Sequence, residues 1–300
     1  MRILLTGASG AIGASMRGGL EAQGHEVVAV SRSGHVGGAR TTLRLDDLLR
    51  KGVAQFGADA IIHLAGISHR QASATEYQSA NVDLTTELAR SAGPTRFVFA
   101  SSVKAIGELS ERPWSEDAHP APATAYGRSK LLAEQAIAEV PDLDWVALRL
   151  PLVHSPFAKA HFAALMRLAA TPAPLPFADL NTARSLISID SAIAAFASAA
   201  AKRDARGVFH LCDRPSLSPK QMIIAMREGL GRKPNLFALG PAKHLLRLGP
   251  TRTLLEPLEL DDTAFRQTYG YGARADIQSD TALRETAQKW ARTSADRNGW

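Results

Sequence analysis

A tyrosine and a lysine one helical turn apart are the residues in this chain most suited to moving a proton. Tyr126 and Lys130 belong to the segment Tyr126-Gly127-Arg128-Ser129-Lys130, which is expected to open a helix, so both side chains project from one face. A nearby ammonium lowers the pKa of a tyrosine from its ordinary value near ~10 by favouring the phenolate. A phenol tuned in this way can take a proton from an alcohol or give one to a carbonyl.

A hydroxyl that could orient the reacting oxygen ends an apolar run. Phe97-Val98-Phe99-Ala100-Ser101-Ser102 is typical of a buried strand, and ligands of parallel sheets bind beside the carboxyl ends of the strands. We take Ser102, rather than Ser101, as the orienting group. Each of these features alone is common by accident, but their order along the chain predicts a catalytic Ser102–Tyr126–Lys130 triad.

A glycine-rich turn near the N-terminus could bind a pyrophosphate. Thr6-Gly7-Ala8-Ser9-Gly10-Ala11-Ile12-Gly13 lies between an expected strand and an expected helix. Gly7 permits a tight turn, Gly10 lets backbone amides approach the phosphates, and Gly13 lets the helix pack close to the strand. The alternative is a tight turn without a ligand, but the position favours a dinucleotide site.

The end of the second expected strand indicates which dinucleotide is bound. An acid at this place binds the ribose of NAD, whereas a basic residue accommodates the 2′-phosphate of NADP. The chain has Ser31 and Arg32 there and no acid. We therefore expect NADP(H) in preference to NAD(H), with NAD(H) and a merely solvated Arg32 as the alternatives.

A parallel sheet covered by helices would bring these residues together. The sequence fits such a fold, because short apolar runs alternate with longer amphipathic stretches. Short apolar runs predict strands at Arg2 to Thr6, Glu26 to Ser31, Thr41 to Leu45, Ala60 to Leu64, Arg96 to Ala100, Trp145 to Leu150, Ser185 to Ile189 and Gly207 to Leu211. Helices are predicted at Ala11 to Gln23, Ala74 to Ser91, Ala125 to Val140, Ser191 to Lys202, Ser218 to Leu230 and Asp280 to Ala291.

The alternation weakens after residue 150, where the proline-rich stretch 171–176 predicts an extended loop. The expected organisation is a dinucleotide-binding domain over 1–150 and a mainly substrate-binding lobe over 151–300. Segments around 185–211 are expected to return to the sheet of the first domain.

Composition narrows the class of protein further. The 300 residues are 45% hydrophobic and contain no low-complexity tract, which predicts a compact fold. The net charge of +6 comes from scattered residues without a nucleic-acid-binding motif, so we expect small anionic ligands and no nucleic acid.

Cys212 is the only cysteine, which excludes an intramolecular disulfide, and we expect no metal site. Neither a signal peptide nor a membrane span is expected, which predicts a cytoplasmic protein.

The motifs together resemble the extended short-chain dehydrogenase/reductase superfamily, in particular its NAD-dependent epimerase/dehydratase family. The resemblance rests on the T-G-x-x-G-x-I-G loop, His63-Leu64-Ala65-Gly66, Asn81-Val82, Ala100-Ser101-Ser102 and the Tyr126 to Lys130 segment. It implies a Rossmann-type doubly wound α/β fold with a smaller C-terminal substrate-binding lobe, and a homodimer formed through the helices at 74–91 and 125–140. Asn81 would support the active-site helix. The cofactor contacts expected from the motifs and the resemblance are Gly7, Gly10, Ala11, Ile12, Gly13, Ser31, Arg32, Asp46, Leu64, Ala65, Gly66, Tyr126, Lys130, Pro151 and Val153.

The resemblance also implies a substrate site, where this chain departs from the family pattern. Arg184, before an expected strand, matches an arginine that reaches the diphosphate of a nucleotide sugar, although an ordinary surface arginine fits equally well. Val103 and Lys104 stand where dehydratases carry two acids, which disfavours water elimination. Leu152 and His154 replace residues of the family segment after the sixth strand, and His154 fits a packed loop position at least as well as a substrate contact. The expected substrate contacts are Ser102, Lys104, Tyr126, Leu152, His154 and Arg184.

Three functions remain open from the sequence. The first is a nucleotide-sugar 4-epimerase or 4-ketoreductase, and the second is an NADPH-dependent reductase of a carbonyl compound that carries no nucleotide. The third is a non-catalytic NADP(H) sensor, which the Tyr126/Lys130 pair disfavours because a sensor does not need it.

Overall fold

The computed structural model describes residues 1–68, 71–157, 160–242 and 255–298. A seven-stranded parallel sheet forms its centre, with strand order β3-β2-β1-β4-β5-β6-β9. The strands are β1 (Arg2–Thr6), β2 (Glu26–Ser31), β3 (Thr41–Arg44), β4 (Ala60–His63), β5 (Arg96–Ser102), β6 (Trp145–Leu150) and β9 (Gly207–His210). Because the order reverses between β1 and β4, the loops that follow these two strands diverge there and leave room for a ligand.

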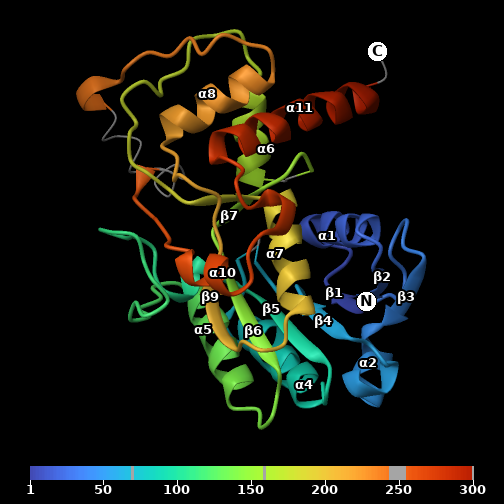
Figure 1. The fold of residues 1–300 in the computed structure, drawn as a ribbon. Coiled ribbons are helices and arrows are strands. Elements are labelled where there is room, and N and C mark those ends of the chain that lie inside the picture. The colour runs from blue at the N-terminus through green and yellow to red at the C-terminus, as the bar shows by residue number, and fades with distance from the viewer. Residues whose placement is uncertain (69–70, 158–159, 243–254, 299–300) are drawn as a thin grey trace.

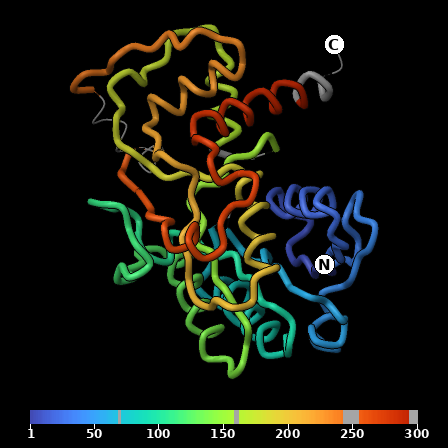
Figure 2. Tube along the Cα trace, in the orientation of Figure 1, coloured from blue at the N-terminus to red at the C-terminus, as the bar shows by residue number. Residues whose placement is uncertain are grey.

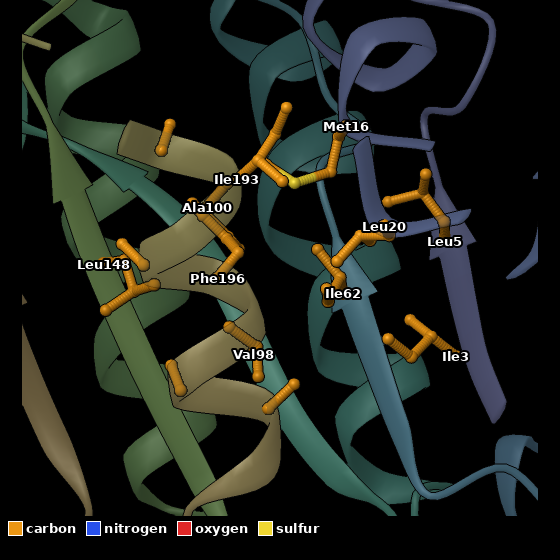
Figure 3. Close-up of a cluster of buried hydrophobic side chains, with 14 of the residues drawn as sticks. Ile3, Leu5, Met16, Leu20, Ile62, Val98, Ala100, Leu148, Ile193 and Phe196 are labelled. Atoms are coloured by element: carbon orange, nitrogen blue, oxygen red, sulfur yellow. The ribbon is translucent and has the colours of Figure 1, made fainter. Parts of the chain in front are cut away.

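Helices cover both faces of the sheet, so most sheet residues are buried (Figure 1). On one face lie α1 (Ala11–Ala22) and α7 (Ile189–Ala201), and Met16, Leu20, Ile193 and Phe196 pack there against side chains such as Ile62 (Figure 3). On the other face lie α2 (Leu45–Lys51), α4 (Leu84–Arg90) and α5 (Ala125–Ala138). This arrangement confirms the predicted doubly wound α/β fold.

A smaller lobe with its own apolar core lies beyond the carboxyl edge of the sheet (Figure 2). It contains α6 (Ala160–Ala169), α8 (Pro219–Gly229) and α11 (Ser279–Asn298). A two-stranded parallel sheet of β7 (Leu152–His154) and β8 (Leu186–Ser188) stands between the lobe and the main sheet. The chain returns from the lobe to the main sheet through α7 and β9. After α8 it returns again through the short α10 (Thr263–Thr268).

The elements differ from the sequence prediction in a few places. The strand expected at 185–189 is shorter and pairs with β7 instead of joining the main sheet. The helix expected at 74–91 is divided into α3 (Ala74–Tyr77), a π-helical segment η2 (Gln78–Asp83) and α4. Short 3-10 turns are present at η1 (Val53–Phe56), η3 (Val103–Ala105) and η5 (Gly272–Arg274). Within the described ranges, no helix is both long and apolar enough to cross a membrane.

Candidate active site

The glycine turn after β1 has no room for a side chain at Gly7 or at Gly13. A Cβ atom at Gly7 would lie 2.8 Å from the Ala65 backbone nitrogen, and Gly7 adopts a φ of +71°. A Cβ atom at Gly13 would overlap the Gly7 carbonyl oxygen and lie 2.8 Å from the Gly7 carbonyl carbon. α1 starts at this turn with Gly10 as its N-cap, without a side-chain cap and without an acidic residue in its first turn. Its positive end is therefore available to an anion, and the turn fits the pyrophosphate of a dinucleotide.

Asn81 ties the loop after β4 to the helix that carries Tyr126. Its Oδ1 accepts a hydrogen bond from the Ile67 backbone nitrogen at 2.7 Å, and its Nδ2 donates to the Ser129 hydroxyl at 2.9 Å. A Cβ atom at Gly66 would come within 2.6 Å of the same Oδ1. Asn81 is fully buried and lies in the π-helical segment, a distortion that often marks a functional site.

Tyr126, Ser102 and Lys130 meet at the carboxyl end of β5. Thr124 caps α5 by accepting from the Gly127 backbone nitrogen, which sets Tyr126 in the first turn. The Tyr126 hydroxyl lies beside the Ser102 side chain, which influences its pKa. Lys130, one turn along, donates from Nζ to the Ala100 carbonyl oxygen at 2.8 Å and lies 4.6 Å from the centre of the Phe99 ring.

The two neighbouring serines have different surroundings. The Ser101 hydroxyl donates to the buried carboxylate of Glu134, which also accepts from Arg149 Nη2 at 2.7 Å. Ser102 instead accepts from the Lys104 backbone nitrogen at 3.2 Å and lies beside Tyr126. Successive residues of a strand face opposite sides, so Ser101 belongs to the packing under α5 and Ser102 to the reacting cluster.

The electrostatics of Tyr126 differ from the sequence-based expectation. Burial raises the pKa of Tyr126 to about 12, while the hydrogen bond with Ser102 opposes that rise. Burial lowers the pKa of Lys130 to about 8, against the attraction of Glu134. The expectation that the pKa of Tyr126 is lowered was wrong for the protein alone, because burial raises it and outweighs the opposing effect of Ser102. The phenol is therefore protonated at neutral pH.

The residues expected to contact the adenosine part of the dinucleotide lie at the ends of β2 and β3. Ser31 donates to the His35 carbonyl oxygen at 3.1 Å, which shapes the loop after β2. The Arg32 side chain is exposed and has no hydrogen bond or ion pair with any residue that the structure describes. Asp46, in the first turn of α2, pairs with Arg44 at 3.2 Å. Arg32 is thus free to pair with an anion.

The expected substrate residues are spread more widely. Lys104 forms an ion pair with Glu108, and Glu108 also accepts from the Thr124 hydroxyl at 3.3 Å, which places this pair beside the start of α5. Leu152 is 42% exposed. Pro151, just before it, is buried, and Val153 packs against the main core.

Arg184 is less free than a diphosphate clamp should be. Its guanidinium is buried and donates from Nη1 to the Glu256 carbonyl oxygen. Burial lowers its pKa, and the nearby acids Glu256 and Glu108 oppose that change. One donor of the bidentate fork is therefore already used within the protein.

His154 occupies a packed position, the alternative to a substrate contact that the sequence already favoured. Its ring is fully buried, stacks on Phe162, and has Nδ1 2.9 Å from the Thr286 hydroxyl. Burial lowers its pKa to about 3, so the ring is neutral. A packed position inside the lobe explains this histidine, and the fully buried ring presents no surface to a ligand.

Sequence reasoning missed some residues that shape this site, because Thr85, Glu108 and Glu134 belong to no motif. The spacing of Ser101, Glu134 and Arg149 holds no local signal, since residues from β5, α5 and β6 meet only in the folded protein. Thr85 could have been found from its place one turn after Asn81 on the same helical face.

The sheet order, the glycine turn and the cluster at the end of β5 define a dinucleotide-binding α/β fold of the extended short-chain dehydrogenase type. Residues 3–212 match the model of the NAD dependent epimerase/dehydratase family, and the chain belongs to that family.

Curated relatives carry two kinds of name. The chain is 32% identical over 216 residues to UDP-glucose 4-epimerase of Vibrio cholerae, a match covering 64% of each chain. It is 32% identical over 249 residues to 2′-dehydrokanamycin reductase of Streptomyces kanamyceticus, covering 77% of this chain and 67% of that protein. The matched segments thus span about two thirds of these two relatives.

A solved structure described as MoeE5 in complex with UDP-glucose and NAD has the same fold over nearly the whole chain. It superimposes with a TM-score of 0.74 at 26% identity, covering 98% of this chain and 99% of that one.

Proposed function

We propose that the protein is a nicotinamide-dependent enzyme that moves a hydride at the carbon bearing a secondary hydroxyl or ketone of a sugar. The observation that carries the proposal is the meeting of Ser102 and Tyr126 at the carboxyl end of β5, with Lys130 one turn along α5. The glycine turn fits the cofactor's pyrophosphate, and Arg32 fits a 2′-phosphate, which favours NADP(H).

The protein's own groups would handle the proton. Ser102 orients the substrate oxygen, and the protonated Tyr126 gives its hydroxyl proton to that oxygen as a ketone becomes an alcohol. In the reverse direction Tyr126 accepts the alcohol proton. A bound nicotinamide supplies or accepts the hydride, and its oxidised form adds a positive charge that lowers the pKa of Tyr126. Lys130, held by the Ala100 carbonyl, ties α5 to the end of β5.

The first candidate substrate is a nucleotide sugar reacting at C4, as the name of the Vibrio cholerae relative indicates for that protein. In the epimerase form the cofactor is regenerated in each turnover, whereas in the reductase form it is consumed. Incubating the protein with UDP-glucose and a trace of NAD⁺ or NADP⁺ separates the two. An epimerase produces UDP-galactose with no net change in cofactor absorbance. The proposal is wrong if the protein binds the cofactor but neither interconverts the two UDP-sugars nor oxidises NADPH with any keto-sugar. A non-catalytic sensor would then be the better explanation.

A second candidate is a reductase of a sugar ketone that carries no nucleotide. It is favoured by Arg184, whose buried guanidinium already donates to the Glu256 carbonyl oxygen and lies near the acids Glu256 and Glu108, which is a poor setting for a diphosphate. The name of the Streptomyces kanamyceticus relative describes such a substrate for that protein. An Arg184→Ala variant discriminates between the two, because only the nucleotide-sugar reaction predicts a large loss of affinity for UDP.

A further inference from the structure

A continuous chain of buried hydrogen bonds runs beneath the dinucleotide site. The Ala65 backbone nitrogen donates to Thr6 Oγ1 at 3.3 Å, and Thr6 Oγ1 lies 2.7 Å from His63 Nδ1. On the other side of the ring, His63 Nε2 lies 2.9 Å from Thr85 Oγ1, which donates to the Asn81 carbonyl oxygen at 2.7 Å. The His63 and Thr85 side chains are fully buried.

The direction of every proton in this chain follows from its last member. Since Thr85 gives its hydroxyl proton to Asn81, it must accept from His63, so Nε2 carries the hydrogen. Nδ1 is then the acceptor for the Thr6 hydroxyl, which leaves Thr6 Oγ1 to accept from Ala65. Each donor has one acceptor only if the imidazole is neutral. Burial, with the charge of Lys130, lowers the pKa of His63 to about 3, which keeps it neutral.

The chain joins three segments that the proposed cofactor site depends on. Thr6 immediately precedes Gly7, and Ala65 lies in the loop that packs against Gly7. Asn81 holds the end of that loop and also bonds Ser129 on α5, between Tyr126 and Lys130. The phosphate turn, the loop after β4 and the catalytic helix are therefore linked through His63 and Thr85.

We infer that His63 and Thr85 are positioning residues, which hold the glycine turn and the loop after β4 in a fixed relation to Asn81 and so set the affinity for the dinucleotide. This inference rests on the proposed function. A purely structural role, in which the bonds only fasten η2 and α4 to the sheet, would stabilise the fold without changing dinucleotide binding.

Neighbouring threonines offer a matched pair of variants. Thr85 and Thr86 both donate to the carbonyl oxygen four residues earlier, at 2.7 and 2.8 Å, but of these two only Thr85 also contacts His63. Thr85→Val removes the acceptor for the buried Nε2–H, and Thr86→Val removes an equivalent helix bond. Thr85→Ser keeps the hydroxyl and serves as the rescue.

Binding of NADPH and NADH is measured by fluorescence titration, and the melting temperature is measured in parallel. We expect Thr85→Val to weaken binding roughly tenfold, the order expected when a buried donor loses its partner. Thr86→Val and Thr85→Ser should bind as the unmodified protein does. Equal binding by all variants, with only the melting temperature lowered in Thr85→Val, would overturn the inference and leave the proposed function standing. No binding by the unmodified protein would overturn both.

If Thr85→Val does not fold, the unmodified protein still decides the question. Nitrogen NMR of the His63 ring should show a neutral imidazole with its hydrogen on Nε2, and the Nδ1 signal should move when NADPH is added. A hydrogen on Nδ1, or no response to NADPH at saturation, would contradict the positioning role.

Discussion

Replacing Gly13 by alanine should damage the dinucleotide site through a single methyl group. A Cβ atom there would overlap the Gly7 carbonyl oxygen and lie 2.8 Å from the Gly7 carbonyl carbon and 2.9 Å from the Ala8 Cα atom. All of these are backbone atoms of the turn itself, so no flexible side chain can move aside. The turn and α1 must separate, and overpacking of this kind costs about 1–3 kcal/mol of folding free energy.

Gly18 in the same helix is the matched control. Its position is exposed, and a methyl group added there would have no heavy atom within 4 Å. Gly18→Ala should therefore stabilise the protein by up to about 1 kcal/mol, the difference in helix propensity. Urea unfolding gives both free energies, and fluorescence titration with NADPH gives both affinities. We expect Gly13→Ala to lose stability and dinucleotide affinity together, and Gly18→Ala to keep its affinity. Undiminished NADPH affinity in a folded Gly13→Ala protein would refute the assignment of the turn as the phosphate site.

Three further outcomes follow from the site. Arg32→Ala should weaken NADPH binding by about tenfold or more, because a charge-assisted bond to the 2′-phosphate is lost, and should leave NADH binding unchanged; equal effects on both cofactors would refute the assigned phosphate contact. Ser102→Ala should lower kcat by about a hundredfold with little loss of stability, whereas Ser101→Ala should mainly lower stability because its hydroxyl bonds the buried Glu134; the reverse pattern would exchange the roles of the two serines. The unfolded chain protonates His154 near its ordinary pKa of 6.5 and the folded protein only near 3, so stability falls as pH drops through this window. Acid unfolding curves measure this loss of stability. In His154→Gln the loss should be smaller by about 1.4 kcal/mol per pH unit, and an unchanged slope would contradict the neutral buried ring.

Much of the fold could be predicted because each buried parallel strand corresponds to a short apolar run in the sequence. β1, β2 and β6 begin and end where the sequence predicts, since each is bounded by a glycine, a proline or a charged residue. The boundaries of β8 and the π-helical segment could not be predicted in this way. The distortion at 78–83 is accompanied by the bonds from Asn81 to Ile67 and Ser129, and those partners are distant in sequence.

The sequence predicts which residues form the candidate site better than it predicts their pKa values. Tyr126, Lys130 and Ser102 follow from spacing and from their place at a strand end or helix start. The pKa of Tyr126 depends on burial and on the neighbouring Ser102 and Tyr77, which are distant from it in sequence. His154 shows the same limit, because in sequence a histidine in an exposed loop and one inside a lobe core look alike until α11 packs against β7 and β8.

The central claim is that Tyr126 transfers the proton that accompanies hydride transfer, and removing its hydroxyl tests this most directly. Tyr126→Phe keeps the ring beside Tyr77 and removes the hydroxyl that lies beside Ser102. With deuterated NADPH and a sugar ketone, or with a UDP-sugar exchanging at C4, the variant should bind the cofactor as before. Its rate of deuterium transfer should fall by about 10²–10⁴-fold. Near-normal transfer by Tyr126→Phe would contradict the account.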